Sequence, residues 1–222
     1  MWRFNSSPYG GAKLVTGLAA AALLGAVGVA RVQTEDPAPE GFTFDSAPVA
    51  VVVGGHKLRI PRSYLSDFVP GKANQTSITL LAHLPDLSSI SVETVPCFVN
   101  RMACDEIVSI EISDMVVPSG SEQLKRLLQG RRARIRSGPY GLKRYVTRTF
   151  DAQQDTYGRA LRGGQFYLVA CLKQPSPFDT CTYQQSASVN LSLKYVFRRT
   201  QLRNWESIHR GIIELLASFR QS

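Results

Sequence analysis

The sequence has few of the side chains that usually hold metal ions, with three histidines and four cysteines among 222 residues. No two cysteines have the two-residue spacing of a redox motif or a zinc knuckle, and no histidine flanks a cysteine. A metal site would need side chains that only the fold brings together, so we expect no metal ion. Nothing in the sequence indicates a cofactor either.

The common catalytic signatures are also missing. The chain has no G-x-S-x-G, no H-E-x-x-H, no phosphate-binding G-x-x-x-x-G-K and no dinucleotide fingerprint. His83 lies near Asp86, but without a nucleophile signature such a pair is more often structural than catalytic. Asp105 and Glu106 are adjacent, and neighbours in a strand point to opposite faces. We predict that the protein is not an enzyme.

No acidic residue precedes Glu35, whereas Arg3 and Lys13 lie ahead of a continuous apolar run, LVTGLAAAALLGAVGVA, at residues 14–30. Basic residues before and acidic residues after such a run predict export of the remaining chain. The length of the run fits both a cleaved signal peptide and a retained membrane anchor, and we favour an anchor over residues 1–31. No cysteine follows the run, so a lipoprotein anchor is not expected, and an amphipathic mitochondrial presequence fits poorly.

Export would place the cysteines in an oxidising compartment, where an even number predicts disulfides. Two bonds among four cysteines allow three connectivities, which the sequence leaves open. A bond from Cys171 to Cys181 would close a proline-containing surface loop and contribute roughly 3 kcal/mol. The predicted disulfide cysteines are Cys97, Cys104, Cys171 and Cys181.

The chain after the apolar run divides into a tether and one domain. Residues 32–41 are acidic and proline-rich without apolar periodicity, which is typical of a tether. Residues 42–222 are enough for one sizeable core, and we predict a single exported domain there.

Several segments of this domain have local signals of secondary structure. Gly54-Gly55 between two runs rich in valine, leucine and isoleucine predicts a hairpin. Ser119 and Glu122 have the spacing of a capping box, which predicts a short helix that stops at Gly130. Further strands are expected at residues 76–82, 106–112, 165–171 and 189–197.

The strongest helix signal comes last, where apolar residues recur at three- and four-residue spacing: Leu202, Trp205, Ile208, Ile212, Leu215, Leu216 and Phe219. The opposite face carries charges of both signs, and His209 is predicted to be exposed near the end of that face. Because mixed charges do not favour a lipid surface, we expect the apolar stripe to pack on the domain's own sheet. The predicted fold class is α+β, with an antiparallel sheet covered by this amphipathic helix after an N-terminal transmembrane or signal segment.

The net charge is +9 and is unevenly distributed along the chain. Residues 32–120 hold five basic and eleven acidic side chains, whereas residues 121–222 hold eighteen basic and six acidic ones. If this polarity survives folding, one surface attracts anions; alternatively, the two halves neutralise each other across their contact.

The centre of the basic half is GRRARIRSGPYGLKRYVTR, residues 130–148. Arginines at alternate positions predict a hairpin with guanidinium groups on one face. With a five-residue loop Arg134 would lie opposite Arg144, and an anionic partner would relieve the repulsion. A solvated face, or a four-residue loop that puts the two arms on opposite faces, are the alternatives. The predicted partner-binding residues are Arg132, Arg134, Arg136, Arg144 and Arg148.

The nature of the anion follows from the predicted compartment. Nucleic acid would suit a basic run, but export and the lack of a recognition motif argue against it. Lipid headgroups, acidic glycans or an acidic protein fit an exported domain better.

Four segments resemble uncharacterised envelope proteins of Gram-negative bacteria: LRIPRSYL at 58–65, HLPDL at 83–87, the C-x9-C loop at 171–181, and LSLKYVFRRTQLRNWESIHRGIIELLASF at 191–219. Some of the proteins that look like these are regarded as immunity proteins of type VI secretion lipase-type toxins. The resemblance implies a binding protein in the periplasm, held by a single inner-membrane span or soluble there if the segment is cleaved. It carries over no functional residue, because the group has no defining site motif to match.

We therefore expect an exported binding protein that neutralises or holds an acidic protein partner, such as a secreted toxin, in the periplasm. A structural subunit of a cell-envelope assembly, with the C-terminal helix as its assembly surface, is the alternative from another class. A periplasmic hydrolase that depends on His83 is the third hypothesis.

Overall fold

The computed structural model describes residues 38, 40–66, 74–101, 103–129, 134–146, 154–173 and 179–220. These residues all belong to one unit of the chain, Asp36–Ser222. The predicted anchor at 1–31 and most of the tether lie outside the described residues, so export and the domain boundaries stay predictions. In the described part of the chain, no helix is long and apolar enough to span a membrane.

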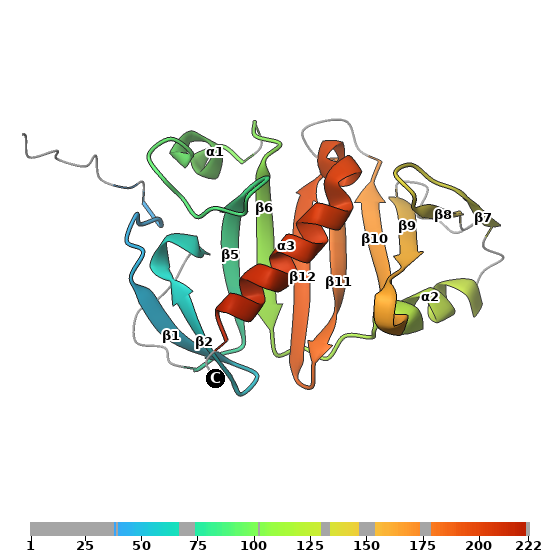
Figure 1. Cartoon of the computed structure of the whole chain (residues 1–222), viewed down its shortest axis with the longest axis horizontal. Coiled ribbons are helices and arrows are strands. Elements are labelled where there is room, and N and C mark those ends of the chain that lie inside the picture. Colours follow the sequence, from blue (N-terminus) through green and yellow to red (C-terminus); the bar gives the residue numbers. More distant parts are fainter. Residues whose placement is uncertain are drawn as a thin grey trace, which may run out of the picture. The chain divides into compact units, whose positions relative to one another are not determined.

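A nine-stranded sheet is the larger of the two sheets in the described chain (Figure 1). Its order is β3-β5-β6-β12-β11-β10-β9-β8-β7, and all its pairings are antiparallel. Its strands are β3 (Leu65–Ser66), β5 (Ser77–His83), β6 (Ile107–Ser113), β7 (Arg134–Ser137), β8 (Lys143–Val146), β9 (Gln154–Ala160), β10 (Phe166–Leu172), β11 (Thr180–Ser188) and β12 (Leu191–Arg198).

A second, smaller sheet has the order β2-β1-β4. It consists of β1 (Pro48–Val53), β2 (His56–Pro61) and β4 (Asn74–Gln75). Strand β1 is antiparallel to β2 and parallel to β4. The turn between β1 and β2 is the predicted Gly54-Gly55 hairpin, in which both glycines have positive φ angles of 58° and 83°. Such angles at both turn residues match the twist of a two-residue hairpin and favour glycine.

The helices are α1 (Val95–Val99), α2 (Gly120–Gln129) and α3 (Trp205–Ser218), with short 3-10 segments at Arg62–Tyr64, Arg162–Gly164 and Arg199–Asn204. The capping box predicted before α2 is present: the Ser119 backbone N–H donates to the Glu122 carboxylate at 2.7 Å, and the Glu122 N–H donates to the Ser119 hydroxyl at 3.3 Å.

The described chain is mostly β, so the predicted α+β class is wrong. The helices α1 and α2 have only five and ten residues. Two strands, β9 (QDTYGRA) and β11 (TCTYQQSAS), escaped prediction because their polar residues do not alternate with apolar ones as a half-buried strand requires. They connect the remaining strands into one sheet.

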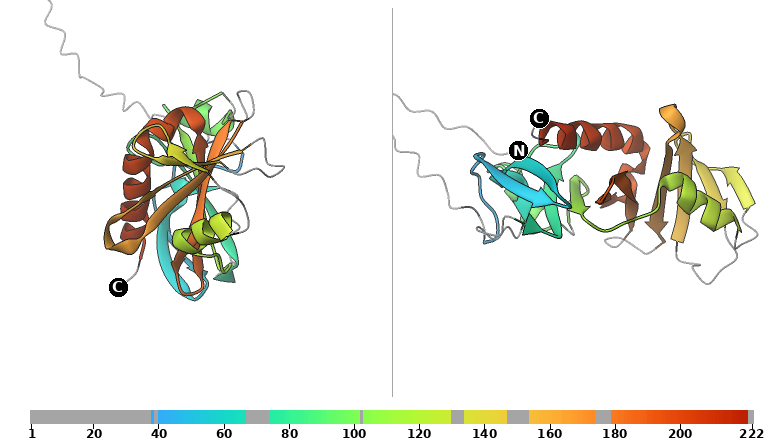
Figure 2. Two further views of the ribbon diagram at one scale, coloured as in Figure 1. Left: turned by 90° about the vertical axis from the view of Figure 1, so that its right-hand side faces the viewer. Right: turned by 90° about the horizontal axis from the view of Figure 1, so that it is seen from below.

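Helix α3 lies across one face of the large sheet and runs from β11 over β12 and β6 toward β5 (Figure 1). Its first residue, Trp205, packs against Tyr167 of β10. Its apolar side is buried as the heptad-like spacing predicts, with Trp205 2% and Ile212 0% exposed. The opposite face of the sheet carries α2, so the two helices lie on opposite sides of it (Figure 2). Because the stripe of α3 is covered by the protein's own sheet, it is not available as the assembly surface of the alternative hypothesis.

The main core lies under α3 and is shared by both sheets. Val51 and Ile60 of the small sheet pack in the same buried cluster as Ile110 and Ile212. The Arg59 backbone N–H donates to the carbonyl at the end of α3, Phe219, at 2.7 Å. This bond ties the small sheet to the C-terminal helix.

A satellite core lies on the other face of the sheet, under α1. It buries Leu81, Ile90, Phe98 and Ile107. A disulfide joins Cys97 in α1 to Cys104, with Cα atoms 5.3 Å apart. The bond closes the short segment that carries α1 over this core.

Candidate functional site

The arginine hairpin forms, with a register that differs from the predicted one. Strands β7 and β8 pair so that Arg136, not Arg134, lies opposite Arg144. The centre of the loop lies one residue further along the chain than predicted, so each residue of β7 pairs with a residue of β8 two positions further on. A change of register by two residues leaves every side chain on the same face of the sheet. Arg134, Arg136 and Arg144 therefore share a face, as the sequence pattern predicts. Arg132 and Arg148 lie outside the described residues.

Arg144 does not point to a partner, because it is held inside the protein by Asp155 of β9. The Arg144 Nε and Nη2 atoms lie 3.0 and 2.7 Å from the same Asp155 carboxylate oxygen. Asp155 is only 6% exposed. Arg199 donates to the other carboxylate oxygen at 2.8 Å, and Lys173 lies 3.2 Å from the first. Three cations thus surround one buried carboxylate.

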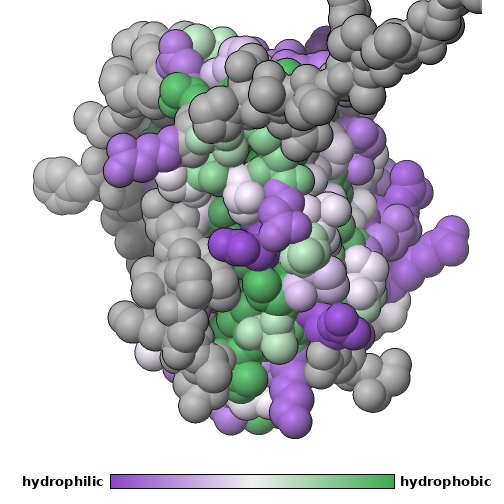
Figure 3. Space-filling model, turned by 90° about the vertical axis from the view of Figure 1, so that its left-hand side faces the viewer, coloured by the Kyte–Doolittle hydropathy of each residue, from purple (hydrophilic) through white to green (hydrophobic). Residues whose placement is uncertain are grey.

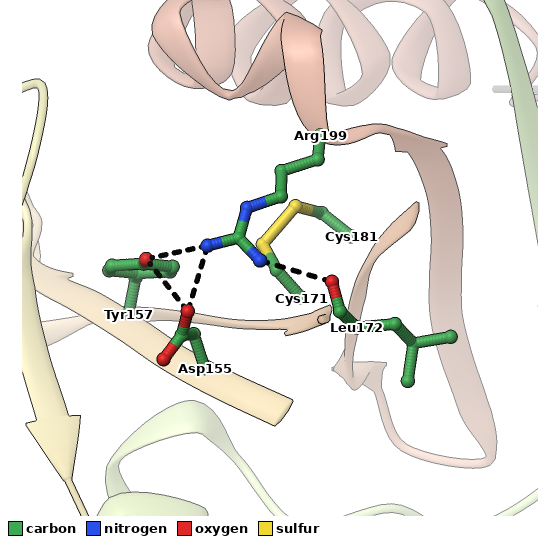
Figure 4. Close-up of a disulfide and its surroundings, with 6 residues drawn as sticks. All are labelled: Asp155, Tyr157, Cys171, Leu172, Cys181 and Arg199. Carbon is green, nitrogen blue, oxygen red and sulfur yellow. Dashed lines mark hydrogen bonds and ion pairs between the residues drawn. A yellow bond between two sulfur atoms is a disulfide. The ribbon is translucent and has the colours of Figure 1, made fainter. Parts of the chain in front are cut away.

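Figure 4 shows the part of this cluster that contains Asp155 and Arg199, whose guanidinium lies next to a disulfide. One guanidinium nitrogen contacts Asp155 and the Tyr157 hydroxyl, and the other donates to the Leu172 carbonyl at 3.1 Å. The planar guanidinium therefore joins the 3-10 segment Arg199–Asn204 to strands β9 and β10 through directed hydrogen bonds.

The charges of the cluster alter the acidity of its members. Burial by itself raises the pKa of Asp155, but the hydrogen bonds from Arg199, Lys173 and Arg144 outweigh it and hold the pKa below its usual range. Burial and the neighbouring Asp155 carboxylate raise the pKa of Tyr157. Asp155 is thus ionised at neutral pH, and its charge offsets only one of three cations.

The disulfide in Figure 4 joins Cys171 to Cys181, which lie directly opposite each other on β10 and β11. Together with Cys97–Cys104 it accounts for all four cysteines. Both sulfurs of this second bond belong to fully buried residues, at 0% exposed. The bond itself therefore lies in the core. Residues 174–178 of the loop that it closes lie outside the described chain, so the predicted surface position of the loop stays a prediction.

Arg134 and Arg136 stand at the end of the sheet, on a strand whose residues are all exposed. Within the described residues, neither forms an ion pair. They lie on the same face as the Arg144–Asp155 pair, because Arg136 is the cross-strand partner of Arg144. Of the three predicted partner-binding arginines that the structure describes, these two have guanidinium groups that are not engaged in a described ion pair.

The charge polarity of the sequence is preserved along the large sheet. The β7–β10 end of the sheet with α2, residues 120–129, 134–146 and 154–173, carries nine basic and two acidic side chains. The opposite end, residues 40–66, 74–101 and 103–114, carries four basic and eight acidic ones. Since β7 to β10 follow one another in the chain and in the sheet, the basic half of the sequence builds one end of the domain. We call residues 120–129, 134–146 and 154–173 the basic end.

A groove of about 590 Å³ lies at the basic end, between α2 and the sheet face opposite α3. Its floor is made of uncharged side chains from β9, β10 and β11, and Arg126 of α2 lies on its wall. The Gln123 amide of α2 donates to the Gln184 carbonyl at 2.6 Å and so holds α2 beside the groove. The lining residues are Gln123, Arg126, Leu127, Gln154, Thr156, Leu168, Ala170, Leu172, Thr182 and Gln184.

The other sequence-predicted groups do not assemble into a reactive site in the described chain. Asp86 is engaged by the Ser88 hydroxyl at 3.0 Å, and no hydrogen bond joins it to His83. Cys97, Cys104 and Glu106 gather within 4.8 Å of one another, but both sulfurs are committed to the disulfide. That leaves one carboxylate, which does not make a metal site.

His209 is buried, so the prediction that it is exposed is wrong. It is 8% exposed and its Nδ1 lies 3.0 Å from the Tyr195 hydroxyl. Stacked rings of Tyr167, Tyr183 and Tyr195 from three adjacent strands lie beneath it. The wide aromatic surface of the sheet extends the buried side of α3 past its aliphatic stripe, which the helix periodicity alone does not reveal. Burial lowers the pKa of His209 to about 4.

Sequence reasoning also missed the Asp155 cluster. The signal for it was present, because Asp155 is the single acidic residue between positions 152 and 178, a stretch with three basic residues. A lone carboxylate in such a stretch, opposite a buried cysteine in the strand pairing, is a candidate for an internal ion pair.

The fold is shared with proteins of known structure, although no protein-family model and no curated protein matches the chain. It is similar to an immunity protein of the Stenotrophomonas maltophilia type IV secretion system, with a TM-score of 0.61 and 17% sequence identity, over 84% of this chain and 98% of that one. It is also similar to the iron-regulated outer membrane lipoprotein FrpD of Neisseria meningitidis, with a TM-score of 0.54 and 14% identity, over the same shares.

At these identities the likeness establishes a common fold. The expected resemblance to immunity proteins holds at this coarse level, since one of the two structures is an immunity protein. Its finer part, the link to lipase-type toxins of type VI secretion, has no support in these comparisons.

Proposed function

We propose that the protein is an exported, membrane-tethered binding protein that neutralises or holds an acidic protein partner in the periplasm, in the manner of an immunity protein. The observation that carries the proposal is the basic end, where nine basic side chains meet two acidic ones on a fold that an immunity protein also has. Electrostatic complementarity of this kind speeds encounter and selects among partners.

The described chain supports binding by occlusion better than catalysis. Its one buried carboxylate at the basic end, Asp155, is held ionised by Arg144, Arg199 and Lys173, as in a structural ion cluster. Arg134 and Arg136 are exposed and rigidly placed, since β7 pairs with β8 along its whole length. Two guanidinium groups on one strand face suit carboxylates on a protein surface.

The experiment is an affinity capture from envelope and secreted fractions with the full-length protein as bait. The test variant is Arg134→Glu with Arg136→Glu. The matched control is Lys57→Glu with Arg59→Glu, the same charge change on exposed positions of β2 at the other end of the domain. We expect an acidic secreted protein to be held by the wild type and the control and to be lost from the test variant.

Two other results would count against the proposal. Capture of the same acidic protein by all three baits would show that Arg134 and Arg136 of β7 are not needed for binding. Resident membrane proteins retained equally by all three would favour the envelope-assembly alternative, with the arginines as a solvated face.

A further inference from the structure

Strand β7 is the last strand of the nine-stranded sheet. Within the described chain no strand pairs with its outer edge, and all four of its residues are exposed. An unpaired edge presents a row of backbone N–H and C=O groups to which another chain can add a strand.

The hydrogen-bond pattern of the hairpin shows which backbone groups face outward. The Gly138 N–H donates to the Leu142 carbonyl at 2.9 Å, so this pair is bonded across the hairpin. Bonded and non-bonded pairs alternate along an antiparallel ladder. Arg136 is therefore bonded to its partner Arg144, and Ile135 and Ser137 direct their N–H and C=O groups toward the outer edge.

The side chains of β7 define what an added strand must carry. Arg134 and Arg136 lie on the α3 face, where the Asp155 carboxylate is already engaged by Arg144. Ile135 points to the opposite face, where it is the cross-strand neighbour of Tyr145 and is 55% exposed. A strand beside β7 would therefore meet positive charge on one face and an apolar side chain on the other.

We propose that the outer edge of β7 binds an extended segment of the acidic partner in which acidic and apolar side chains alternate, with the backbone groups of Ile135 and Ser137 completing the ladder. This inference rests on the proposed function and names how the partner docks. Acidic side chains pair with Arg134 and Arg136, and apolar ones cover Ile135. Cross-strand pairs of opposite charge and of apolar side chains stabilise such a ladder.

Two other surfaces do not combine basic and apolar side chains in the way that β7 does. The groove beside α2 is lined by neutral amides and hydroxyls, with a single arginine. On the face at the β1–β2 end, hydrophobic side chains gather near the centre with hydrophilic ones among and around them (Figure 3). Among the strands that the structure describes, β7 combines unpaired backbone groups with charge of one sign on one face and an exposed apolar side chain on the other.

The experiment follows amide hydrogen exchange by NMR in the full-length protein, with a synthetic peptide of alternating glutamate and valine as the probe. In the protein alone, the amides of Ile135 and Ser137 should exchange rapidly and that of Arg136 slowly. The peptide should slow exchange at Ile135 and Ser137 by about tenfold or more, since an added strand protects both. A control peptide of the same composition, with glutamates and valines in separate blocks, should not.

The variant Ile135→Pro removes one outward N–H and leaves the bonds to β8 intact, because proline is tolerated where the N–H faces away from the ladder. We expect it to weaken peptide binding by about threefold to tenfold, while Ile135→Thr, which keeps the N–H, binds nearly as well as the wild type. Slow amide exchange at Arg136 in Ile135→Pro verifies that the hairpin of this variant is intact. If the variant loses the hairpin, strand addition is judged from the exchange data on the wild-type protein.

The outcomes separate this inference from the proposed function. Peptide binding without slower exchange at Ser137, or no peptide binding at all, overturns strand addition. If Arg134→Glu with Arg136→Glu still abolishes capture of the acidic protein in that case, the proposed function stands with docking through side chains only. If capture is unaffected as well, both fail. A β7 edge that only deters aggregation gives fast exchange at Ile135 and Ser137 under every condition, which also overturns the inference.

Discussion

His209 shows how one residue links helix packing to pH. It lies between α3 and the tyrosines of the sheet, with its Nδ1 on the Tyr195 hydroxyl. A neutral imidazole fits this site, and a charged one does not, because burial penalises the charge.

The depressed pKa of His209 predicts a loss of stability in mild acid. The unfolded chain takes up a proton at this residue near pH 6.5, and the folded chain does so only near the pKa of about 4. As the pH falls from about 6.5 to about 4, the unfolded state binds more protons, so the free energy of unfolding decreases, by up to about 3 kcal/mol. Below about pH 4 this loss levels off. Urea unfolding at a series of pH values measures it.

The variant His209→Leu isolates the contribution of this side chain. It should be less stable than the wild type at neutral pH, because the hydroxyl of Tyr195 loses its partner. The difference in stability between the two proteins should shrink as the pH falls through this window. A constant difference would contradict the assignment.

Asp155 is the corresponding case for a buried carboxylate. Replacing it by asparagine leaves Arg144, Lys173 and Arg199 without their common anion. We expect Asp155→Asn to lower the free energy of unfolding by about 2 kcal/mol, less than for a fully buried pair because these cations are 30 to 37% exposed.

Denaturant unfolding measures the stability of Asp155→Asn. The control is Asp114→Asn, the same substitution at an exposed aspartate. The control should change stability by no more than about 0.5 kcal/mol. Since the pKa of Asp155 is lowered in the folded protein, its contribution is present at neutral pH and is lost only as the pH falls below its ordinary value of 3.8. Equal effects of the two substitutions would show that the cluster does not stabilise the fold.

At the scale of elements, the disulfide between β10 and β11 joins the innermost strand of the basic end, β10, to the central part of the sheet. Replacing both Cys171 and Cys181 by alanine should lower the free energy of unfolding by about 3 kcal/mol, because the unfolded chain regains the entropy of the closed loop. Thermal or denaturant unfolding measures this loss.

A thiol assay provides the control for the disulfide. Denatured, unreduced wild-type protein should have no reactive thiols, and reduction should release four. Two or more thiols without reduction would contradict the bonds and with them the expected exported location.

The sequence predicts those elements that carry their own local signal. The Gly54-Gly55 turn, the capping box before α2 and the apolar stripe of α3 depend on neighbours within a few residues, and all three are present. The boundaries of β5, β6 and β10 also agree within one residue.

Elements that depend on distant partners were missed. Strand β11 lies between β10 and β12, where its neighbours bury Tyr183 on one face and leave polar side chains on the other. Val189, predicted to begin a half-buried strand, is instead 81% exposed in the turn before β12. Asp155 likewise meets Arg199, which is 44 residues away in the chain. No local sequence pattern encodes contacts between residues so far apart. The sequence therefore predicted the arginines of the candidate site but not Asp155, which pairs with Arg144.

At the scale of the whole molecule, the order of strands converts a polarity along the chain into a polarity in space. The last four strands of the sheet are β10, β9, β8 and β7, all from the basic half of the sequence. The acidic half builds β3, β5 and β6 at the other end. The two halves meet where β6 pairs with β12, and the ion pairs Lys194–Glu111 and Arg198–Asp105 join them there. The basic end lies on the far side of β11, so the domain presents positive charge to its surroundings at that end.

The most direct test of this account is the affinity between the full-length protein and its captured partner as a function of ionic strength. For the wild type, we expect affinity to fall by about tenfold or more between about 50 and about 300 mM salt, because salt screens attraction between exposed charges. Arg134→Glu with Arg136→Glu should bind weakly at both salt concentrations. A wild-type affinity that does not change with salt, or that the two substitutions leave intact, would contradict the claim that the basic end binds an acidic partner.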